Sequence, residues 1–238
     1  MQENELKQLL AGIYQATADV MNLCDGINEC QFDRIILMGA HGTGKSTLAN
    51  ALNEMLMLPV VESVARNFFS NWKLMESRML IDKRVSDRVM CDTKQDILCS
   101  MSRWDFMRWV EADIPCIMTR CPLDTIAYAM ADDNVSEICV DTNIDSLKSM
   151  DGFEEALKKS LFIYLPIEFE LENDGTRPMD PQYQHDVDVA MRSLMHSFDI
   201  KPLVVSGTVD ERLRTILVEV AGEEVADIFI EAWKESKK

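Results

Sequence analysis

Short apolar segments alternate along the chain with longer stretches in which apolar residues recur at helical spacing. A continuous apolar run bounded by turns is typical of a buried strand, and a spacing of three or four residues is typical of an amphipathic helix. We therefore predict strands within residues 34–38, 58–66, 114–120, 160–166 and 201–208. Helices are predicted from residue 48 onward and over 93–112, 153–159, 182–198 and 209–221. Residues 132–152 are rich in Asp, Asn, Ser and Thr, which predicts a mobile polar insert.

Strands that alternate with helices build a parallel sheet with helices on both faces. The predicted fold class is therefore α/β, with a five-stranded parallel sheet. Two more amphipathic helices are predicted over 5–24 and 223–234. We expect one domain over 1–238, with an N-terminal helix in 1–30, a core over 31–220 and a C-terminal helix in 221–238. The polar face of the first helix is not basic, so this helix is expected to pack on the domain or on a second subunit, which leaves a homodimer open.

The segment between the first strand and the first helix carries the clearest chemical signal. Residues Gly39 to Thr47 match the pattern G-x-x-x-x-G-K-[ST], the loop that wraps a nucleoside triphosphate. Phosphate oxygens need converging backbone N–H groups, and glycine lets the chain curl closely around them. The residues of this P-loop predicted to bind the nucleotide are Gly39, His41, Gly42, Thr43, Gly44, Lys45, Ser46 and Thr47.

Two side chains of the P-loop have expected roles. Lys45 would place its ammonium on the β and γ phosphates, and Ser46 would bind Mg²⁺. The helix that follows would point its positive N-terminal end at the phosphates. The alternative is a glycine turn with a solvated lysine. Gly207, in the turn after the fifth strand, is a candidate for backbone contacts to an adenine ring.

The composition limits the partners of the chain. Its formal net charge is −17, from 24 Lys and Arg against 41 Asp and Glu. Such acidity disfavours unselective binding to nucleic acid or acidic membranes, although it is compatible with a local basic groove. The seven cysteines include no C-x-x-C pair, which fits a reducing compartment better than a zinc or disulfide framework. With no leader pattern and no apolar run near the roughly 18 residues of a membrane span, we expect a soluble cytoplasmic protein.

Polar residues follow the second predicted strand, and open α/β sheets build their sites at the carboxyl ends of strands. Glu62 ends this strand, and it either faces the phosphates or lies in a solvated turn. Residues 66–88 then form the one locally basic stretch, with aromatic residues between the cations. This stretch fits an acceptor with a ring and a phosphate, a nucleic acid, or an amphipathic helix with its aromatic residues in the core.

Two later positions bear on phosphoryl transfer. Thr119 ends the third strand, where P-loop proteins often carry an aspartate that orients Mg²⁺ or acts as a base. A threonine hydroxyl does neither at neutral pH. Arg177 lies in a loop over 172–181 that contains glycine and proline. It is a candidate lid cation that closes over the transferred phosphoryl group, or a partner of its acidic neighbours in a surface ion pair.

With these residues laid out, the chain resembles the P-loop nucleoside and nucleotide kinase group, in particular bacterial nicotinamide riboside kinases and related small ATPases of bacteria and phages. The resemblance runs from about Arg34 to Leu217. Beyond the P-loop it rests on Glu62 and Arg66, similar to E-x-x-x-R; on Arg120, Asp124, Ala127 and Tyr128, similar to D-R-x-x-x-D-x-x-A-Y; and on Asp174, Gly175 and Arg177, similar to D-G-x-R. Ser206, Gly207 and Arg212 look like the adenine-side loop and its following helix. Thr119 departs from the aspartate of the second signature.

The resemblance implies a kinase that uses ATP and Mg²⁺ to phosphorylate a hydroxyl of a nucleoside- or nucleotide-like acceptor. Lys45 and Arg177 would then neutralise the γ-phosphoryl group, and Glu62 would activate the acceptor hydroxyl. The residues that would bind the acceptor are Glu62, Arg66, Arg120 and Asp124, with Arg120 also contributing to catalysis. Given Thr119, either Glu62 takes over as base and indirect Mg²⁺ orienter, or efficient transfer has been lost.

Two other functions stay open. Phage relatives of these kinases include enzymes that phosphorylate 5-hydroxymethyluracil in DNA to start base hypermodification, and residues 66–88 would then face the DNA. The second alternative is a nucleotide-gated regulatory or binding module without kinase activity. It is suggested by Thr119 and by the two extra amphipathic helices.

Overall fold

The computed structural model describes residues 32–65, 68, 71, 87–171 and 180–236. The predicted helix over 5–24 lies outside the described residues, as do Arg66, Arg177 and most of the basic stretch over 66–88. The described chain belongs to two units, one covering Phe32–Leu213 and the other beginning at Arg214. The first unit contains the sheet and every described residue of the candidate site.

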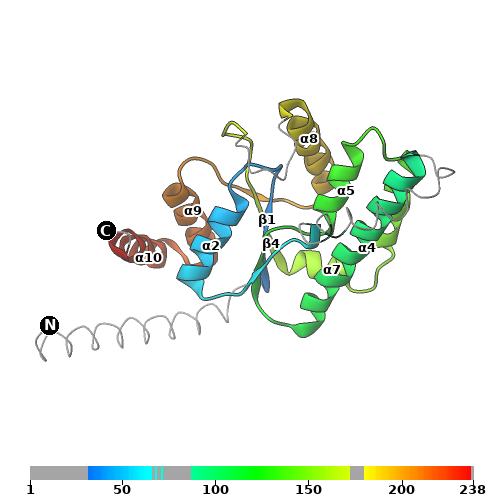
Figure 1. The fold of residues 1–238 in the computed structure, drawn as a ribbon. Coiled ribbons are helices and arrows are strands. Elements are labelled where there is room, and N and C mark those ends of the chain that lie inside the picture. Colours follow the sequence, from blue (N-terminus) through cyan, green and yellow to red (C-terminus); the bar gives the residue numbers. More distant parts are fainter. Residues whose placement is uncertain (1–31, 66–67, 69–70, 72–86, 172–179, 237–238) are drawn as a thin grey trace, which may run out of the picture. The chain divides into compact units, whose positions relative to one another are not determined.

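Five parallel strands form one sheet in the order β2-β3-β1-β4-β5 (Figure 1). Their bounds are β1 Arg34–Met38, β2 Val60–Val61, β3 Cys116–Met118, β4 Ser160–Tyr164 and β5 Leu203–Val204. Each strand lies within a predicted segment, and the predicted α/β class is confirmed. The central strands β1 and β4 are buried at every position, as expected for a parallel sheet covered on both faces.

The helices have the following bounds: α2 Lys45–Leu56, α4 Asp87–Ala112, α5 Pro122–Met130, α6 Glu137–Lys148, α7 Phe153–Lys158, α8 Pro181–Ser197, α9 Val209–Ala221 and α10 Glu223–Ser236. One face of the sheet packs on α4, α5, α7 and α8 through Ile36, Met38, Met118 and Phe162. Helix α2 lies on the opposite face (Figure 1). In a strand, successive side chains point to opposite faces, so the continuous apolar run of β1 contributes side chains to the packing on both faces of the sheet.

The predicted mobile insert over 132–152 is wrong, because this segment contains helix α6. Ser136 is the N-cap of α6, and its hydroxyl accepts a hydrogen bond from the backbone N–H of Cys139. The backbone N–H and the hydroxyl of Ser136 both donate to the carboxylate of Asp92 on α4, at 2.7 and 2.8 Å. Polar residues therefore cap this helix and hold it against α4. A polar composition alone does not distinguish such a helix from a loop.

We expect Asp92→Ala to lower the free energy of unfolding by about 1 kcal/mol, because it removes both hydrogen bonds to the cap of α6. Urea denaturation measures the change. Asp141→Ala, on an exposed position of the same helix, is the matched control and should change stability by less than about 0.5 kcal/mol. Equal effects of the two substitutions would contradict the capping role of Asp92.

None of the described helices is both long enough and apolar enough to cross a membrane.

Candidate functional site

The P-loop connects β1 to α2 and has the backbone shape that its glycines allow. Gly39 has φ +142° and Gly44, the N-cap of α2, has φ +89°. A Cβ at Gly39 would overlap the carbonyl oxygen of Leu165, the residue that follows β4. The loop thus packs directly on the neighbouring strand connection, at the carboxyl edge of the sheet.

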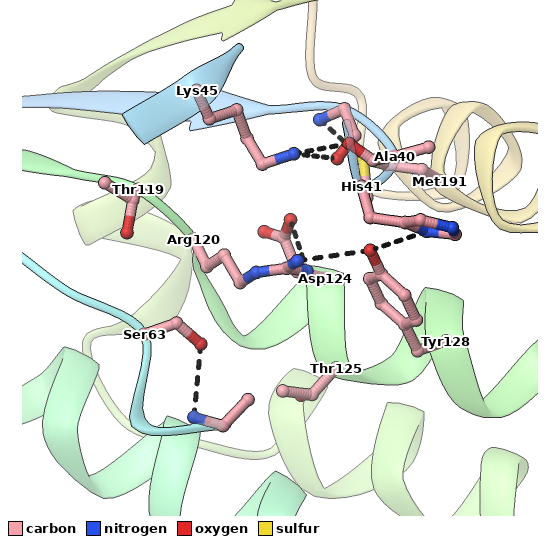
Figure 2. Close-up of polar contacts among 12 residues, drawn as sticks. Ala40, His41, Lys45, Ser63, Thr119, Arg120, Asp124, Thr125, Tyr128 and Met191 are labelled. Atoms are coloured by element: carbon pink, nitrogen blue, oxygen red, sulfur yellow. Dashed lines mark hydrogen bonds and ion pairs between the residues drawn. The ribbon is translucent and has the colours of Figure 1, made fainter. Parts of the chain in front are cut away.

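Lys45 is buried in the centre of the P-loop. Its ammonium donates hydrogen bonds to the carbonyl oxygens of Gly39 and Ala40, both at 2.6 Å (Figure 2). A third contact, at 3.3 Å, joins it to the hydroxyl of Thr43. The loop therefore holds a positive charge within its own curve, as an anion-binding loop requires. Ser46 and Thr47, at the start of α2, are exposed.

Helix α8 fixes the opposite side of the P-loop. The amide nitrogen of Gln184 donates to the carbonyl oxygen of His41 at 2.6 Å, and the backbone N–H of Gly39 lies 3.0 Å from the sulfur of Met191. These contacts join residues more than a hundred positions apart in the sequence. The shape of the loop therefore depends on tertiary packing as well as on its glycines.

Arg212 links the P-loop to the turn after β5. Its guanidinium donates to the carbonyl oxygen of Thr43 at 2.8 Å and pairs with Glu168 at 2.5 Å. The backbone N–H of Gly207 donates to the same carboxylate at 3.0 Å. Hydrogen bonding from Arg212 lowers the pKa of Glu168, so this carboxylate stays ionised. Gly207, the predicted adenine-side residue, is thus connected to the P-loop through two charged side chains.

The guanidinium of Arg212 also lies over the ring of half-exposed Phe169, 5.0 Å from its centre. This stacked pair stands beside the P-loop, because Arg212 is bonded to Thr43.

A second group of polar residues lies where β2 and β3 end. Glu62 and Ser63 follow β2, and Arg120 follows β3. Together with Ser102 and Asp105 of α4 they line a small hollow of about 10 Å³. Glu62 is exposed, whereas the side chain of Arg120 is only 16% exposed. The hollow therefore brings an exposed carboxylate and a shielded cation to one place.

Arg120 is the centre of a chain of contacts that leads back to the P-loop (Figure 2). It donates to the hydroxyl of Tyr128 at 3.1 Å and lies 4.7 Å from the centre of that ring. The Tyr128 hydroxyl lies 3.4 Å from Nδ1 of His41. Burial opposes the charge on Arg120, but Tyr128 and Asp124 raise its pKa, so it remains a cation.

Asp124 is completely buried in the first turn of α5. Its Oδ2 accepts a hydrogen bond from the backbone N–H of Cys121 at 2.8 Å, which caps the helix. Its Oδ1 lies 3.8 Å from Arg120 and has no hydrogen-bond partner among the described residues. Burial raises the pKa of Asp124, while the charges of Arg120 and Lys45 act to lower it. Figure 2 shows the carboxylate between the ends of these two cations.

Thr119 does not point its hydroxyl into the P-loop. The side chain is buried, and its hydroxyl donates to the carbonyl oxygen of Val61 in β2 at 3.3 Å. The residue therefore reinforces the pairing of β2 and β3.

The sequence of this core matches a known family. A family model described as an AAA domain matches residues 34–212. The chain belongs to this AAA domain family. The match covers the P-loop, Glu62 and Arg120 of the hollow, and Arg212.

Two solved structures have the fold of this AAA domain. Deoxyadenosine kinase from M. mycoides with bound dCTP is 17% identical with a TM-score of 0.52, and the alignment covers 79% of this chain and 98% of that chain. The same kinase with bound dATP gives 14% identity, a TM-score of 0.50 and coverages of 79% and 98%. The AAA domain thus has the α/β fold of P-loop kinases. A comparison with curated proteins found no match.

The structure brings together most of the predicted site residues of the AAA domain that it describes. Glu62 and Arg120 share the hollow, and Asp124 lies beside Lys45. Other contributors were not predicted from the sequence: Ser63, Ser102, Asp105, Glu168 and Gln184. One signal was available for the last of these, because Asp180 and Pro181 are a typical start of a helix and place residue 184 in its first turn.

Gly39→Ala should destabilise the AAA domain by about 1–3 kcal/mol, because the new Cβ meets a backbone oxygen at a left-handed φ. Gly152→Ala is the matched control. This glycine also has positive φ, at +78°, but its Cβ would meet only a methionine side chain at 3.7 Å. Chemical denaturation should therefore show a larger loss for Gly39→Ala, and equal losses would contradict the close packing of the P-loop.

Proposed function

We propose that this AAA domain is a kinase that uses ATP and Mg²⁺ to phosphorylate a hydroxyl of a nucleoside- or nucleotide-like acceptor. One observation carries the proposal: the P-loop with Lys45 and the hollow with Glu62 and Arg120 lie at the same edge of the sheet, joined through Tyr128 and His41. Transfer of a phosphoryl group needs a donor and an acceptor held side by side more than it needs a strong base.

The residues of the P-loop fit a nucleoside triphosphate with its metal. Close packing forces glycine at position 39, Lys45 carries the charge that phosphates need, and Asp124 has a buried carboxylate oxygen without a hydrogen-bond partner in the described chain. The described side chains form no cluster of three or more metal-binding groups, so Mg²⁺ would be held through Ser46 and the phosphates themselves. Bound Mg²⁺ neutralises charge on the phosphates.

On the acceptor side, Glu62 takes the proton of the acceptor hydroxyl, which its exposed position in the hollow supports. Arg120 orients the acceptor and offsets negative charge near the reacting groups. Arg66 and Arg177 keep their predicted roles as acceptor ligand and lid cation, and both lie outside the described residues. The turn at Gly207 receives the adenine ring beside Arg212 and Phe169.

The fold shared with deoxyadenosine kinase supports a nucleoside as the acceptor. A net charge of −17 is unfavourable for a DNA acceptor. The free acceptor is therefore proposed over 5-hydroxymethyluracil in DNA, and both belong in the test.

The test incubates the protein with γ-labelled ATP and Mg²⁺ and, in separate reactions, with free nucleosides, mononucleotides and DNA that contains 5-hydroxymethyluracil. Label in a nucleoside or nucleotide supports the proposal, and label only in DNA supports the DNA kinase instead. Tight ATP binding without transfer to any acceptor would contradict the kinase and favour the nucleotide-gated module.

A further inference from the structure

The carboxylate of Asp124 is the most unusual polar group of the site. It is fully buried, and in the part of the chain that the structure describes only Oδ2 has a hydrogen-bond partner, the N–H of Cys121. Buried polar atoms nearly always have a partner, because leaving one without costs free energy. A carboxylate has capacity for several donors or a cation, and here that capacity is unused at Oδ1.

Two charged neighbours, Arg120 and Lys45, locate the Oδ1 atom of Asp124. Arg120 lies 3.8 Å away, beyond hydrogen-bond distance, and Lys45 acts on the carboxylate electrostatically from the P-loop side. Figure 2 shows the carboxylate on the path from Arg120 to Lys45. The Oδ1 atom, which has no partner among the described residues, therefore lies between the P-loop and the hollow at the end of β3.

Thr119 leaves that space without a carboxylate of its own. Its hydroxyl is used by the backbone of β2, through Val61. Asp124 lies in the first turn of α5, and α5 begins at the carboxyl end of β3, so both positions serve the same edge of the sheet. The first turn of α5 therefore supplies a buried carboxylate at the edge of the sheet where position 119 has none.

We propose that the carboxylate of Asp124 faces the Mg²⁺ of the bound nucleotide and helps to position it, a role for which position 119 has no carboxylate. The inference rests on the proposed nucleotide-binding function and adds a residue to it. Ser46 and the phosphates would be the ligands of the metal, and Asp124 would act as a positioning residue for it.

The simpler role for Asp124 is structural, as a cap of α5 and an ion-pair partner of Arg120. The two roles differ in what they predict for Asp124→Asn. The amide oxygen still accepts the N–H of Cys121, so the cap is kept, while the negative charge is lost. A role toward the metal predicts a large loss of metal affinity in this variant, whereas a structural role alone predicts little change.

The experiment measures Mn²⁺ binding by electron paramagnetic resonance, in the presence of a non-hydrolysable ATP analogue. We expect Asp124→Asn to raise the Kd of Mn²⁺ in the nucleotide complex by at least about tenfold. The Kd of the analogue without metal, measured in EDTA, should stay the same or fall, because a negative charge next to Lys45 has been removed. Asp92→Asn is the matched control, since that carboxylate also receives the N–H of a helix cap but faces α6, and its Mn²⁺ Kd should equal that of the wild type.

The outcomes separate this inference from the proposed function. If the wild-type protein binds neither the analogue nor Mn²⁺ with it, the proposed function fails and the inference fails with it. If the wild type binds both and Asp124→Asn leaves the Mn²⁺ Kd unchanged, Asp124 has only the structural role and the inference alone is overturned.

A measurement on the wild type covers the case in which Asp124→Asn does not fold. Aspartate labelled with ¹³C at the side-chain carboxyl gives one signal per residue, and the signal of Asp124 is assigned through its backbone by triple-resonance NMR. Addition of Mn²⁺ and the analogue should broaden this signal strongly. A signal that stays sharp would overturn the inference.

Discussion

Lys45→Ala is expected to lower kcat/KM for phosphoryl transfer at least about 1000-fold, to the background of the assay. The ammonium of Lys45 is the charge held inside the P-loop, where it bonds to the carbonyl oxygens of Gly39 and Ala40. Its loss removes stabilisation of the charge that develops on the transferred group. Formation of ADP and of phosphorylated acceptor measures the effect.

Lys201→Ala is the control for this substitution. Lys201 is exposed and precedes β5, so it stands at the amino edge of the sheet, away from the P-loop. The Lys201→Ala substitution removes the same charge from the protein and should leave kcat/KM within about twofold of the wild-type value. Thermal unfolding of both variants separates loss of transfer from loss of fold. Substantial transfer by a folded Lys45→Ala protein would contradict the assignment of the P-loop as donor site.

Glu62→Gln is expected to lower kcat at least about 100-fold, a loss of roughly 3 kcal/mol in transition-state stabilisation. The amide keeps the size of the side chain in the hollow but cannot take the proton of the acceptor hydroxyl. The KM for the acceptor should change much less than kcat, because hydrogen bonding is retained. Steady-state kinetics with the acceptor identified by the labelling assay gives both constants.

Glu111→Gln, an exposed residue near the end of α4, makes the same chemical change outside the hollow and should leave kcat unaffected. A near-normal kcat for Glu62→Gln would exclude Glu62 as the base. Asp105, the second carboxylate that lines the hollow, would then be the residue to substitute.

The strands and the P-loop were predictable from the sequence because their signals are local. A buried apolar run such as β1 followed by glycines at fixed spacing has few other interpretations. The segment around α6 was misjudged because its polar residues serve the cap and the docking to Asp92. The docking involves a partner on another helix, α4, and no local pattern reveals it.

Several residues of the candidate site were named from the sequence, but the directions of their side chains were not. Thr119 was identified as the position that lacks a carboxylate, and the structure adds that its hydroxyl is engaged by Val61. Asp124 was identified as an acceptor ligand, whereas its burial and its closeness to Lys45 follow only from the packing of α5. Spacing along the chain does not determine which way a side chain points across the gap between two elements.

The contacts that surround the P-loop have a consequence for protein engineering. Gln184 and Met191 of α8, Arg212 of α9 and Leu165 after β4 lie against its backbone. Grafting the motif alone into another α/β scaffold would leave these supports behind, and the grafted glycines would then sample many conformations. A functional graft would have to carry over α8 as far as Met191, the first turn of α9 and the residue after β4 as well.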